Sequence, residues 1–306
     1  MNEIRVRSWA ELLDQLYLDS WKESIGRFRS SYAYRGVSTA ACDLTTSLIR
    51  LGGQPDRIEG HLLRNFRKYA IQETNCGRST WSWLALAQHH GLPTRLLDWT
   101  YSPLVAMHFA TAKERPGQDA LIWCIDFVAA HRLLPRRLHR LLESEGSDVF
   151  TVEMLDAAAP TLTRLDTLAR QPFVVFLEPP SLDARIVNQS ALFALLSSPS
   201  ASMDDWLADH PDVYRRILIP AALRREVRDK LDQANVTERV LFPGLDGLSA
   251  WLRRYYQPGN GGGPTLEPCE QNLDNAPFTD QPPGPETEPE PGPEPERNPK
   301  KRRRKR

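Results

Sequence analysis

The chain has 306 residues, of which 41% are hydrophobic and 25% are charged, and its formal net charge is zero. This composition is that of an ordinary globular protein and excludes a fibrous or wholly disordered chain. No apolar stretch is long enough for a membrane span, and the charged N-terminus lacks the apolar core of a secretory signal, so we expect a cytoplasmic protein. The four cysteines are too widely spaced for a disulfide framework or a zinc site and are expected to be reduced: Cys42, Cys76, Cys124 and Cys269.

The first half of the chain predicts three helices and one short strand. Ser8 followed by Glu11 forms a capping box that opens an amphipathic helix over Ser8–Leu18. Tyr32–Arg35 alternates like a strand and ends at Gly36, which places Arg35 and Tyr34 on opposite faces. Apolar residues at helical spacing predict two more helices, over Arg57–Tyr69 and Trp81–His90, the second ending at Gly91 before Pro93.

The second half predicts a helix followed by several strands. Ser102 and Pro103 have the pattern of an N-cap and first helical residue, opening a helix to Ala112. Because helices and strands are mixed without a βαβ rhythm, we expect an α+β fold, with helices around a strongly bent antiparallel or mixed sheet. The expected strands are Leu121–Phe127, Phe173–Leu177, Ala191–Leu196, Arg216–Ile219 and Val240–Phe242.

The last part of the chain, residues 258–306, changes in composition. It holds 12 of the 25 prolines with 8 basic and 9 acidic residues, so we expect it to be disordered, after a single globular domain over residues 1–257. Gly259–Pro264 is a flexible hinge, Pro282–Glu296 an extended Pro/Glu tract, and Lys300–Arg306 a run of seven cations. This polybasic run can bind nucleic acid or another polyanion and act as an electrostatic tether.

The segment Gln88–Thr100 carries an unusual density of polar side chains. One interpretation is structural: Arg95 and Asp98 pair across a loop, and Thr100 and Ser102 cap the next helix. A metal site that uses His89, His90 and His108 is less favoured, because the chain has no HExxH pair and adjacent histidines point to different helix faces. The other interpretation is a ligand site.

Several motifs together resemble the FRG domain, named for its Phe/Tyr-Arg-Gly signature. They begin with Tyr34-Arg35-Gly36, continue through Leu44 and Ser47–Arg50, and reach Trp83-Leu84 and the long motif Gln88–Ala110. A second block contains Arg185-Ile186 with Gln189 and Phe193, and Leu241–Leu248 is similar to the closing block of the family. The resemblance covers about residues 5–256.

The resemblance implies that the polar motif residues meet in one cationic cleft. Arg35 and Arg95 favour a nucleotide-like anionic ligand, because a planar guanidinium binds phosphate through two hydrogen bonds. His90 is a candidate for proton transfer, and Asp98 either orients a neighbour or acts as a base. The candidate catalytic residues are therefore Arg35, His90 and Gln189, and the candidate ligand-binding residues are Tyr34, Thr94, Arg95, Asp98 and Arg185; no metal is expected.

The Tyr-Arg-Gly motif is also distantly similar to the first motif of mono-ADP-ribosyltransferases, in which the arginine holds NAD. This similarity makes NAD the candidate cofactor and ADP-ribosyl transfer or NAD cleavage the candidate reaction. Gln189 stands where those enzymes have a glutamate, so Glu178 or Asp183 is the candidate for the missing carboxylate.

Two alternatives remain open. One is a non-catalytic module that binds a nucleotide or nucleic acid, with bases stacked on Trp81, Trp83, Trp99 or Tyr101; core packing is the competing interpretation of these aromatics, especially of Trp83 and Trp99. The other is an interaction scaffold whose motifs only stabilise the fold.

Overall fold

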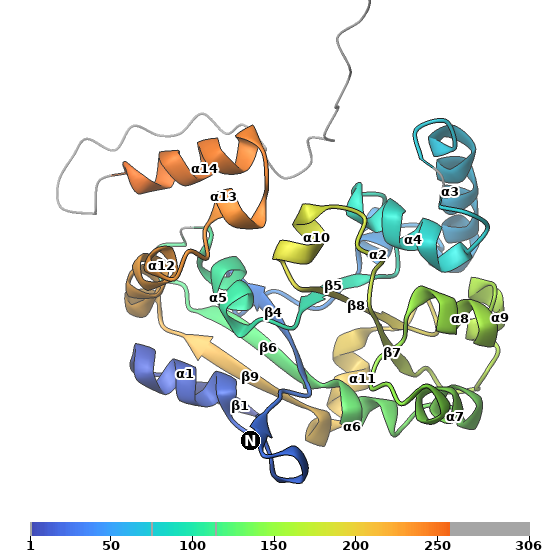
Figure 1. The fold of residues 1–306 in the computed structure, drawn as a ribbon, viewed down its shortest axis with the longest axis horizontal. Helices are drawn as coiled ribbons and strands as arrows, with labels where there is room; N and C mark the ends of the chain where they lie inside the picture. Colours follow the sequence, from blue (N-terminus) through green and yellow to red (C-terminus); the bar gives the residue numbers. More distant parts are fainter. Residues whose placement is uncertain (1, 75, 114, 258–306) are drawn as a thin grey trace, which may run out of the picture. The chain divides into compact units, whose positions relative to one another are not determined.

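The computed structural model describes residues 2–74, 76–113 and 115–257 (Figure 1). The segment expected to be disordered, with its polybasic run Lys300–Arg306 and Cys269, lies outside these residues. The three cysteines within the described ranges, Cys42, Cys76 and Cys124, are free thiols.

Seven strands form one mixed sheet, which confirms the expected α+β class (Figure 1). The pair β1–β9 is parallel and every other pair in this sheet is antiparallel. In spatial order the strands are β1 (Glu3–Arg5), β9 (Tyr214–Ile219), β6 (Ala120–Asp126), β4 (Tyr32–Val37), β5 (Leu97–Thr100), β8 (Ala191–Leu196) and β7 (Val174–Leu177). A separate two-stranded hairpin pairs β2 (Trp21–Lys22) with β3 (Arg27–Phe28).

Helices pack on both faces of the sheet and form three apolar cores. The first core lies between one half of the sheet, formed by β1, β9, β6 and β4, and three helices. These helices are α1 (Trp9–Tyr17), α5 (Pro103–Thr111) and α12 (Arg224–Gln233). The second lies on the opposite face, under α6 (Phe127–His131) and α11 (Met203–Asp209). The third joins β7 and β8 to α3 (Pro55–Ala70), α4 (Thr80–His89), α7 (Arg136–Glu145), α8 (Val152–Ala158) and α9 (Leu162–Asp166).

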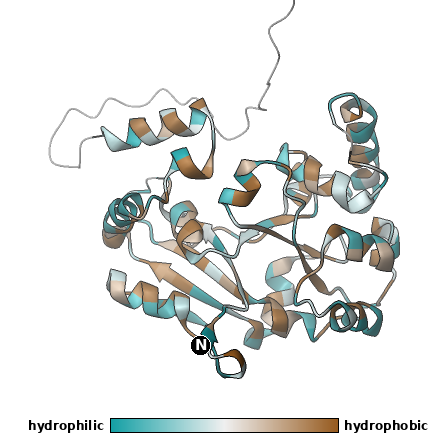
Figure 2. Ribbon diagram, in the orientation of Figure 1, coloured by the Kyte–Doolittle hydropathy of each residue, from teal (hydrophilic) through white to brown (hydrophobic). Residues whose placement is uncertain are grey.

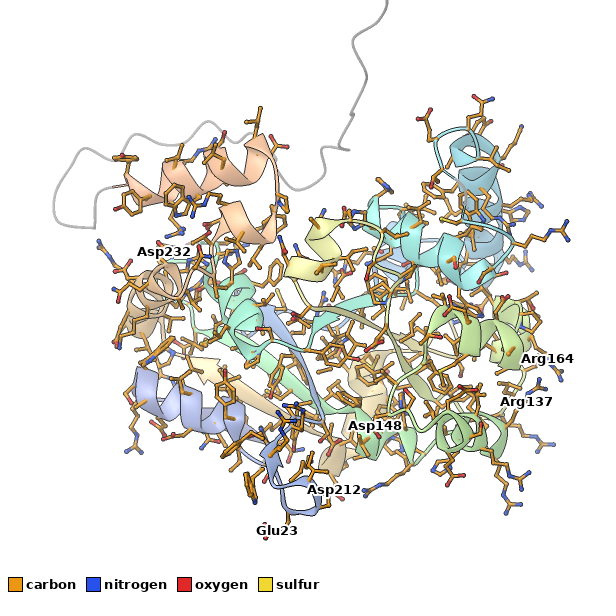
Figure 3. All side chains as sticks on the ribbon, in the orientation of Figure 1. Glu23, Arg137, Asp148, Arg164, Asp212 and Asp232 are labelled. Atoms are coloured by element: carbon orange, nitrogen blue, oxygen red, sulfur yellow. The ribbon has the colours of Figure 1, made fainter. Side chains whose placement is uncertain are left out.

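The remaining helices are short or lie late in the chain: α2 (Ser47–Leu51), α10 (Ala184–Asn188), α13 (Glu238–Leu241) and α14 (Leu245–Tyr255). Figure 2 shows that the central strands are largely hydrophobic, whereas the outer helices carry hydrophilic residues. In Figure 3 the labelled side chains of Arg137 on α7 and Arg164 on α9 lie at the outside of the molecule. Within the described residues, no helix combines the length and apolar character needed to cross a bilayer.

The helix ends follow the capping signals in the sequence. Ser8 accepts a hydrogen bond from the backbone N–H of Glu11 at 3.2 Å, and the Glu11 carboxylate accepts one from the N–H of Arg7 at 2.8 Å. Ser102 caps α5 in the same way, accepting from the N–H of Val105 at 3.3 Å. Gly91, directly after the C-cap of α4, has a φ of 78°, which favours glycine. These predicted boundaries are confirmed to within about two residues.

Two expectations about local structure are wrong. Residues 240–242 are not a strand, because α13 includes Val240 and Leu241, with the Thr237 hydroxyl accepting from the N–H of Val240. A Thr-Glu start favours a helix over the strand that three apolar residues suggested. The polar segment before α5 is not entirely a loop, since Leu97–Thr100 forms β5 between β4 and β8.

Strand β4 is bonded unequally along its two edges. It pairs with β6 at six successive positions but with β5 only at Tyr34 and Thr100. Beyond that pair the two strands diverge, and the Asp98 carbonyl oxygen accepts a hydrogen bond from the Arg35 side chain. The divergence of β4 and β5 therefore positions the first part of the candidate site.

Candidate functional site

The three residues of the Tyr-Arg-Gly motif have three different environments. The Tyr34 side chain is buried, and its hydroxyl donates to the Leu16 carbonyl oxygen at 2.8 Å. Burial raises the pKa of this phenol to about 12. A Cβ atom at Gly36 would lie 1.9 Å from the Ala106 carbonyl oxygen, so α5 can approach the sheet only at a glycine. Tyr34 and Gly36 thus build the fold, and Arg35 alone is left to contact a ligand.

Among the described residues, no carboxylate is paired with the positive charge of Arg35. One guanidinium nitrogen donates to the Asp98 carbonyl oxygen, while Nε is buried and has no hydrogen-bond partner in the described part of the chain. Arg35 forms no ion pair with a described residue. Burial lowers the pKa of Arg35, the Asp98 charge opposes this effect, and the nearby cation Arg50 lowers the pKa further. Such a guanidinium favours an anionic group.

Arg95 is placed very differently from the expectation of a cationic ligand contact. Its side chain is 2% exposed and donates to both Glu59 oxygens, with Nε 2.8 and 3.0 Å from them. It also donates to Asp166 at 2.5 Å and to the Ser197 carbonyl oxygen at 3.0 Å. Burial lowers the pKa of Arg95, but hydrogen bonds and charge from the two carboxylates outweigh burial and raise it overall. Arg95 therefore joins α3, α9 and the end of β8, and it does not pair with Asp98.

Asp98 is held by Gln88 from the last turn of α4. The Gln88 amide nitrogen donates to the two Asp98 carboxylate oxygens at 3.1 and 3.0 Å. The Gln88 amide oxygen accepts from the hydroxyl of Thr94, which is itself buried and bonded through its N–H to the Ser47 hydroxyl at 3.1 Å. The Asp98 carboxylate stays exposed, so Gln88 fixes its orientation and leaves it accessible.

The segment just before the second block contacts the central motif at His89. Its Nε2 lies 2.7 Å from an Asp183 carboxylate oxygen. The other Asp183 oxygen accepts from the N–H of Ile186 at 3.0 Å and caps α10. His90, the candidate base, is exposed at the C-cap of α4; its imidazole makes no hydrogen bond to a described residue and lies 5.2 Å from the His89 ring.

Gln189 and Arg185 contact the closing block of the sequence. The Gln189 amide nitrogen donates to the Leu241 carbonyl oxygen at 3.0 Å, and the guanidinium of Arg185 lies 5.2 Å from the ring centre of Phe242. Asn188 donates to the residue just before that block, at the carbonyl oxygen of Val240, over 2.7 Å. The amide donor of Gln189 therefore has a structural partner, whereas Arg185 is exposed.

The structure thus places several of the predicted residues in two groups, together with Gln88 and His89, whereas Tyr34, Arg95 and Gln189 lie in neither. The first group is Arg35, Asp98, Gln88 and Thr94; the second is His89, Asp183, Arg185 and His90. The neighbours Gln88 and His89 connect the groups through α4. Sequence reasoning missed Arg50 and Gln88 as site residues and considered His89 only as a metal ligand, although all three lie inside the quoted motifs. Motif membership was the available signal, but it does not tell which side chain faces which.

The tryptophans near the motif are part of the core. Trp81, Trp83 and Trp99 are each at most 3% exposed. The indole N–H of Trp81 donates to the Ala159 carbonyl oxygen at 2.8 Å. This confirms core packing for Trp83 and Trp99 and leaves no stacking surface on the three rings. Tyr101 is partly buried, with its hydroxyl 2.8 Å from a Glu178 oxygen.

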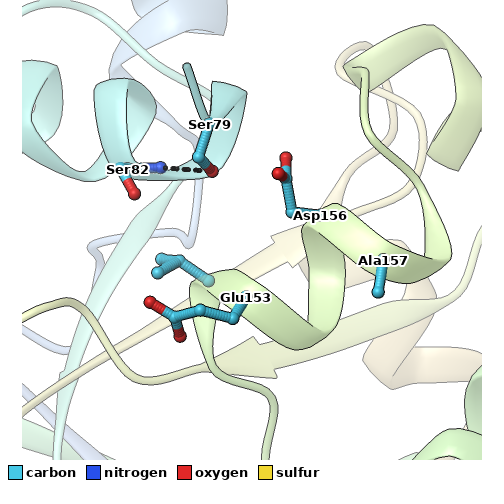
Figure 4. A pocket seen from close by; sticks show the side chains of 6 residues that line it. Ser79, Ser82, Glu153, Asp156 and Ala157 are labelled. Carbon is cyan, nitrogen blue, oxygen red and sulfur yellow. Dashed lines mark hydrogen bonds between the residues drawn. The ribbon is translucent and has the colours of Figure 1, made fainter. Parts of the chain in front are cut away.

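Two surface concavities lie elsewhere. One of about 340 Å³ separates the N-terminal end of α4 from α8 and is lined by Ser79, Ser82, Val152, Glu153, Asp156 and Ala157 (Figure 4). Its two carboxylates and lack of cations make it unsuited to phosphate. The other, of about 280 Å³, lies beside α6 and α7. Within the described ranges, no cluster of three or more metal-ligating side chains occurs.

A family model described as the FRG domain matches residues 30–119. The chain contains an FRG domain. The match begins just before β4 and includes Arg35, Gln88, His89 and Asp98, whereas Asp183, Arg185 and the closing block lie beyond it. No curated protein and no solved structure gives a significant match to the chain.

Proposed function

We propose that the FRG domain binds a nucleotide-like ligand of the NAD class at Arg35 and Asp98. The observation that carries this proposal is the Arg35 guanidinium, which has a buried Nε without a partner and no ion pair to a described residue. In contrast, Arg95 is neutralised by two carboxylates. An uncompensated guanidinium in a partly buried position is stabilised by an anion such as a phosphate.

The neighbours of Arg35 fit the other parts of a nucleotide. Arg50 is an exposed second cation close enough to lower the pKa of Arg35, and it supplies further charge for a diphosphate. The Asp98 carboxylate, held by Gln88, is exposed and can accept hydrogen bonds from ribose hydroxyls. Together they supply cations for phosphate and an anion for sugar.

A small nucleotide fits these residues better than a nucleic-acid strand. Binding of single strands relies on aromatic rings on which bases stack. Trp81, Trp83 and Trp99 are buried and cannot serve in that way. We therefore favour a mononucleotide or dinucleotide ligand for this site. A role of Lys300–Arg306 in binding a polyanion stays a separate prediction.

The candidate reaction is NAD-dependent ADP-ribosyl transfer or NAD cleavage. It needs a carboxylate near the scissile bond, where positive charge develops on the ribose. Asp183 supports this reaction, because it lies two residues before the second block and is held beside His89. Gln189 is less suited, since its amide nitrogen is bonded to the Leu241 carbonyl oxygen.

Calorimetric titration of the full chain with NAD, ADP-ribose and AMP tests the proposal. We expect Arg35→Gln to weaken binding by about 10- to 100-fold, the range for losing charge-assisted hydrogen bonds. The matched control is Arg253→Gln, an exposed arginine on α14, which should bind like the wild type. Equal affinities of wild type and Arg35→Gln, or no binding of any of the three compounds by the wild type, would refute the proposal.

A further inference from the structure

We infer that His89 and Asp183 form an acid–base dyad, in which His89 accepts the proton from the water molecule that cleaves the bound NAD. This inference deepens the proposed function and rests on it. It assigns the proton transfer to His89 instead of His90, the residue that the sequence motif favoured.

The dyad is built from two elements that each fix one partner. His89 lies in the last turn of α4, and its Nε2 is 2.7 Å from Asp183 Oδ2. Asp183 is the N-cap of α10, and its Oδ1 accepts from the N–H of Ile186. With one oxygen used by the helix cap, Asp183 presents the other to His89 in a single orientation. The carboxylate therefore fixes the tautomer of His89 with the proton on Nε2.

This tautomer leaves a lone pair on Nδ1. That atom has no hydrogen-bond partner among the described residues and does not belong to the buried unpartnered polar atoms, so solvent reaches it. The His89 side chain as a whole is only 13% exposed. His131 differs, because both of its ring nitrogens are occupied, by the Asp148 carbonyl oxygen and by the N–H of Phe176. His89 combines a carboxylate-bound nitrogen with an accessible one.

Burial is the main reason that His89 stays neutral near pH 7. Burial lowers its pKa, Asp183 raises it, and the neighbours Arg185 and His90 lower it, with a net result below the ordinary value of 6.5. The lone pair on Nδ1 is therefore available at neutral pH. Arg185, exposed on α10, also adds a cation near His89 that can attract an anionic ligand.

The step is balanced as a hydrolysis. The water oxygen forms a bond to C1′ of the nicotinamide ribose while the bond from C1′ to the ring nitrogen breaks, and the bonding electron pair leaves on nicotinamide. A water proton moves to Nδ1 of His89, giving an imidazolium that Asp183 stabilises. The imidazolium then releases this proton to solvent, so the products are ADP-ribose, nicotinamide and one proton. Transfer to a protein replaces water with an acceptor hydroxyl and leaves the proton's route unchanged.

The test measures nicotinamide release by chromatography and NAD binding by calorimetry, both on the full chain. For His89→Gln we expect a loss of turnover of about 10²-fold or more, the range of general-base catalysis, with NAD affinity within about threefold of the wild type. Asp183→Asn keeps a good N-cap and removes the charge, so turnover should fall and the acidic limb of its pH profile should move to lower pH. His139→Gln, a surface histidine 3.5 Å from Glu143, is the matched control and should keep wild-type turnover.

The outcomes separate the two claims. If the wild type binds NAD and His89→Gln releases nicotinamide at the wild-type rate, the dyad is refuted and binding stands. The same holds if His90→Gln abolishes release and His89→Gln does not, or if the wild type binds NAD without cleaving it. Absence of NAD binding in the wild type overturns both claims.

Discussion

Replacing Arg95 with methionine should lower the free energy of unfolding of the domain and leave the chemistry of the ligand site unchanged. The side chain is almost completely buried and bonded to Glu59, Asp166 and the carbonyl oxygen of Ser197. Methionine fills part of the volume but leaves Glu59, whose side chain is 5% exposed, as a buried charge without a cation. Breaking a buried ion pair in this way costs about 3–5 kcal/mol of unfolding free energy. For a domain of this size, that corresponds to a melting temperature lower by roughly 6–20 °C.

Urea unfolding followed by circular dichroism measures the change in unfolding free energy. Arg253→Met, which removes an exposed arginine of α14, should change it by less than about 0.5 kcal/mol. The double variant Glu59→Met with Arg95→Met should recover part of the loss, because the stranded carboxylate is gone. If Arg95→Met kept wild-type stability and lost nucleotide binding, Arg95 would be a ligand contact and the reasoning from its burial would be wrong.

Three further predictions concern the fold. Gly36→Ala should lower the unfolding free energy by about 1–3 kcal/mol or more in urea titrations, because its Cβ would collide with the Ala106 carbonyl oxygen of α5; an unchanged midpoint would contradict the close approach. The N–H of Phe176 donates to Nε2 of His131, which therefore stays neutral in the fold, and burial lowers its pKa to about 4. Because the folded pKa is below the unfolded value near 6.5, the contribution of neutral His131 to the free energy of unfolding is complete above pH 6.5. It is lost as the pH falls towards 4, by about 3 kcal/mol. His131→Leu should remove this part of the pH dependence in unfolding titrations at several pH values. Deleting residues 258–306 should leave the melting temperature unchanged in scanning calorimetry, and a large drop would show that the segment stabilises the domain.

Signals that act over a few residues predicted the fold well. Ser8, Ser102 and Gly91 mark helix ends through bonds to residues at most four positions away, and these are confirmed. The strands of the second half also follow from their apolar runs, except at Val240–Phe242. There a capping threonine decided for a helix, and a run of three apolar residues is too short to decide between the two.

The partners of the polar residues were beyond the reach of sequence spacing. Asp98 lies three residues after Arg95, which suggested a pair, but Arg95 bonds to carboxylates 36 and 71 positions away in the chain. Only the third core, which brings α3 and α9 to the end of β8, creates that arrangement. Similarly, the sequence does not distinguish the roles of the adjacent residues His89 and His90. Only the position of α10 in the fold brings the Asp183 carboxylate to His89.

The unequal backbone pairing of β4 with its two neighbours divides the sheet into two parts. Strands β1, β9, β6 and β4 form one part and β5, β8 and β7 the other. The two parts share the second apolar core, but β4 and β5 are joined by only one register pair and by the bond from Arg35 to the Asp98 carbonyl oxygen. A boundary with so few backbone bonds opens at a lower free energy than the six-pair edge with β6, so amide protons along it should exchange with solvent first. The Arg35 side chain bridges this weakly paired edge, so an anion bound by its guanidinium would be held at the boundary between the two parts of the sheet.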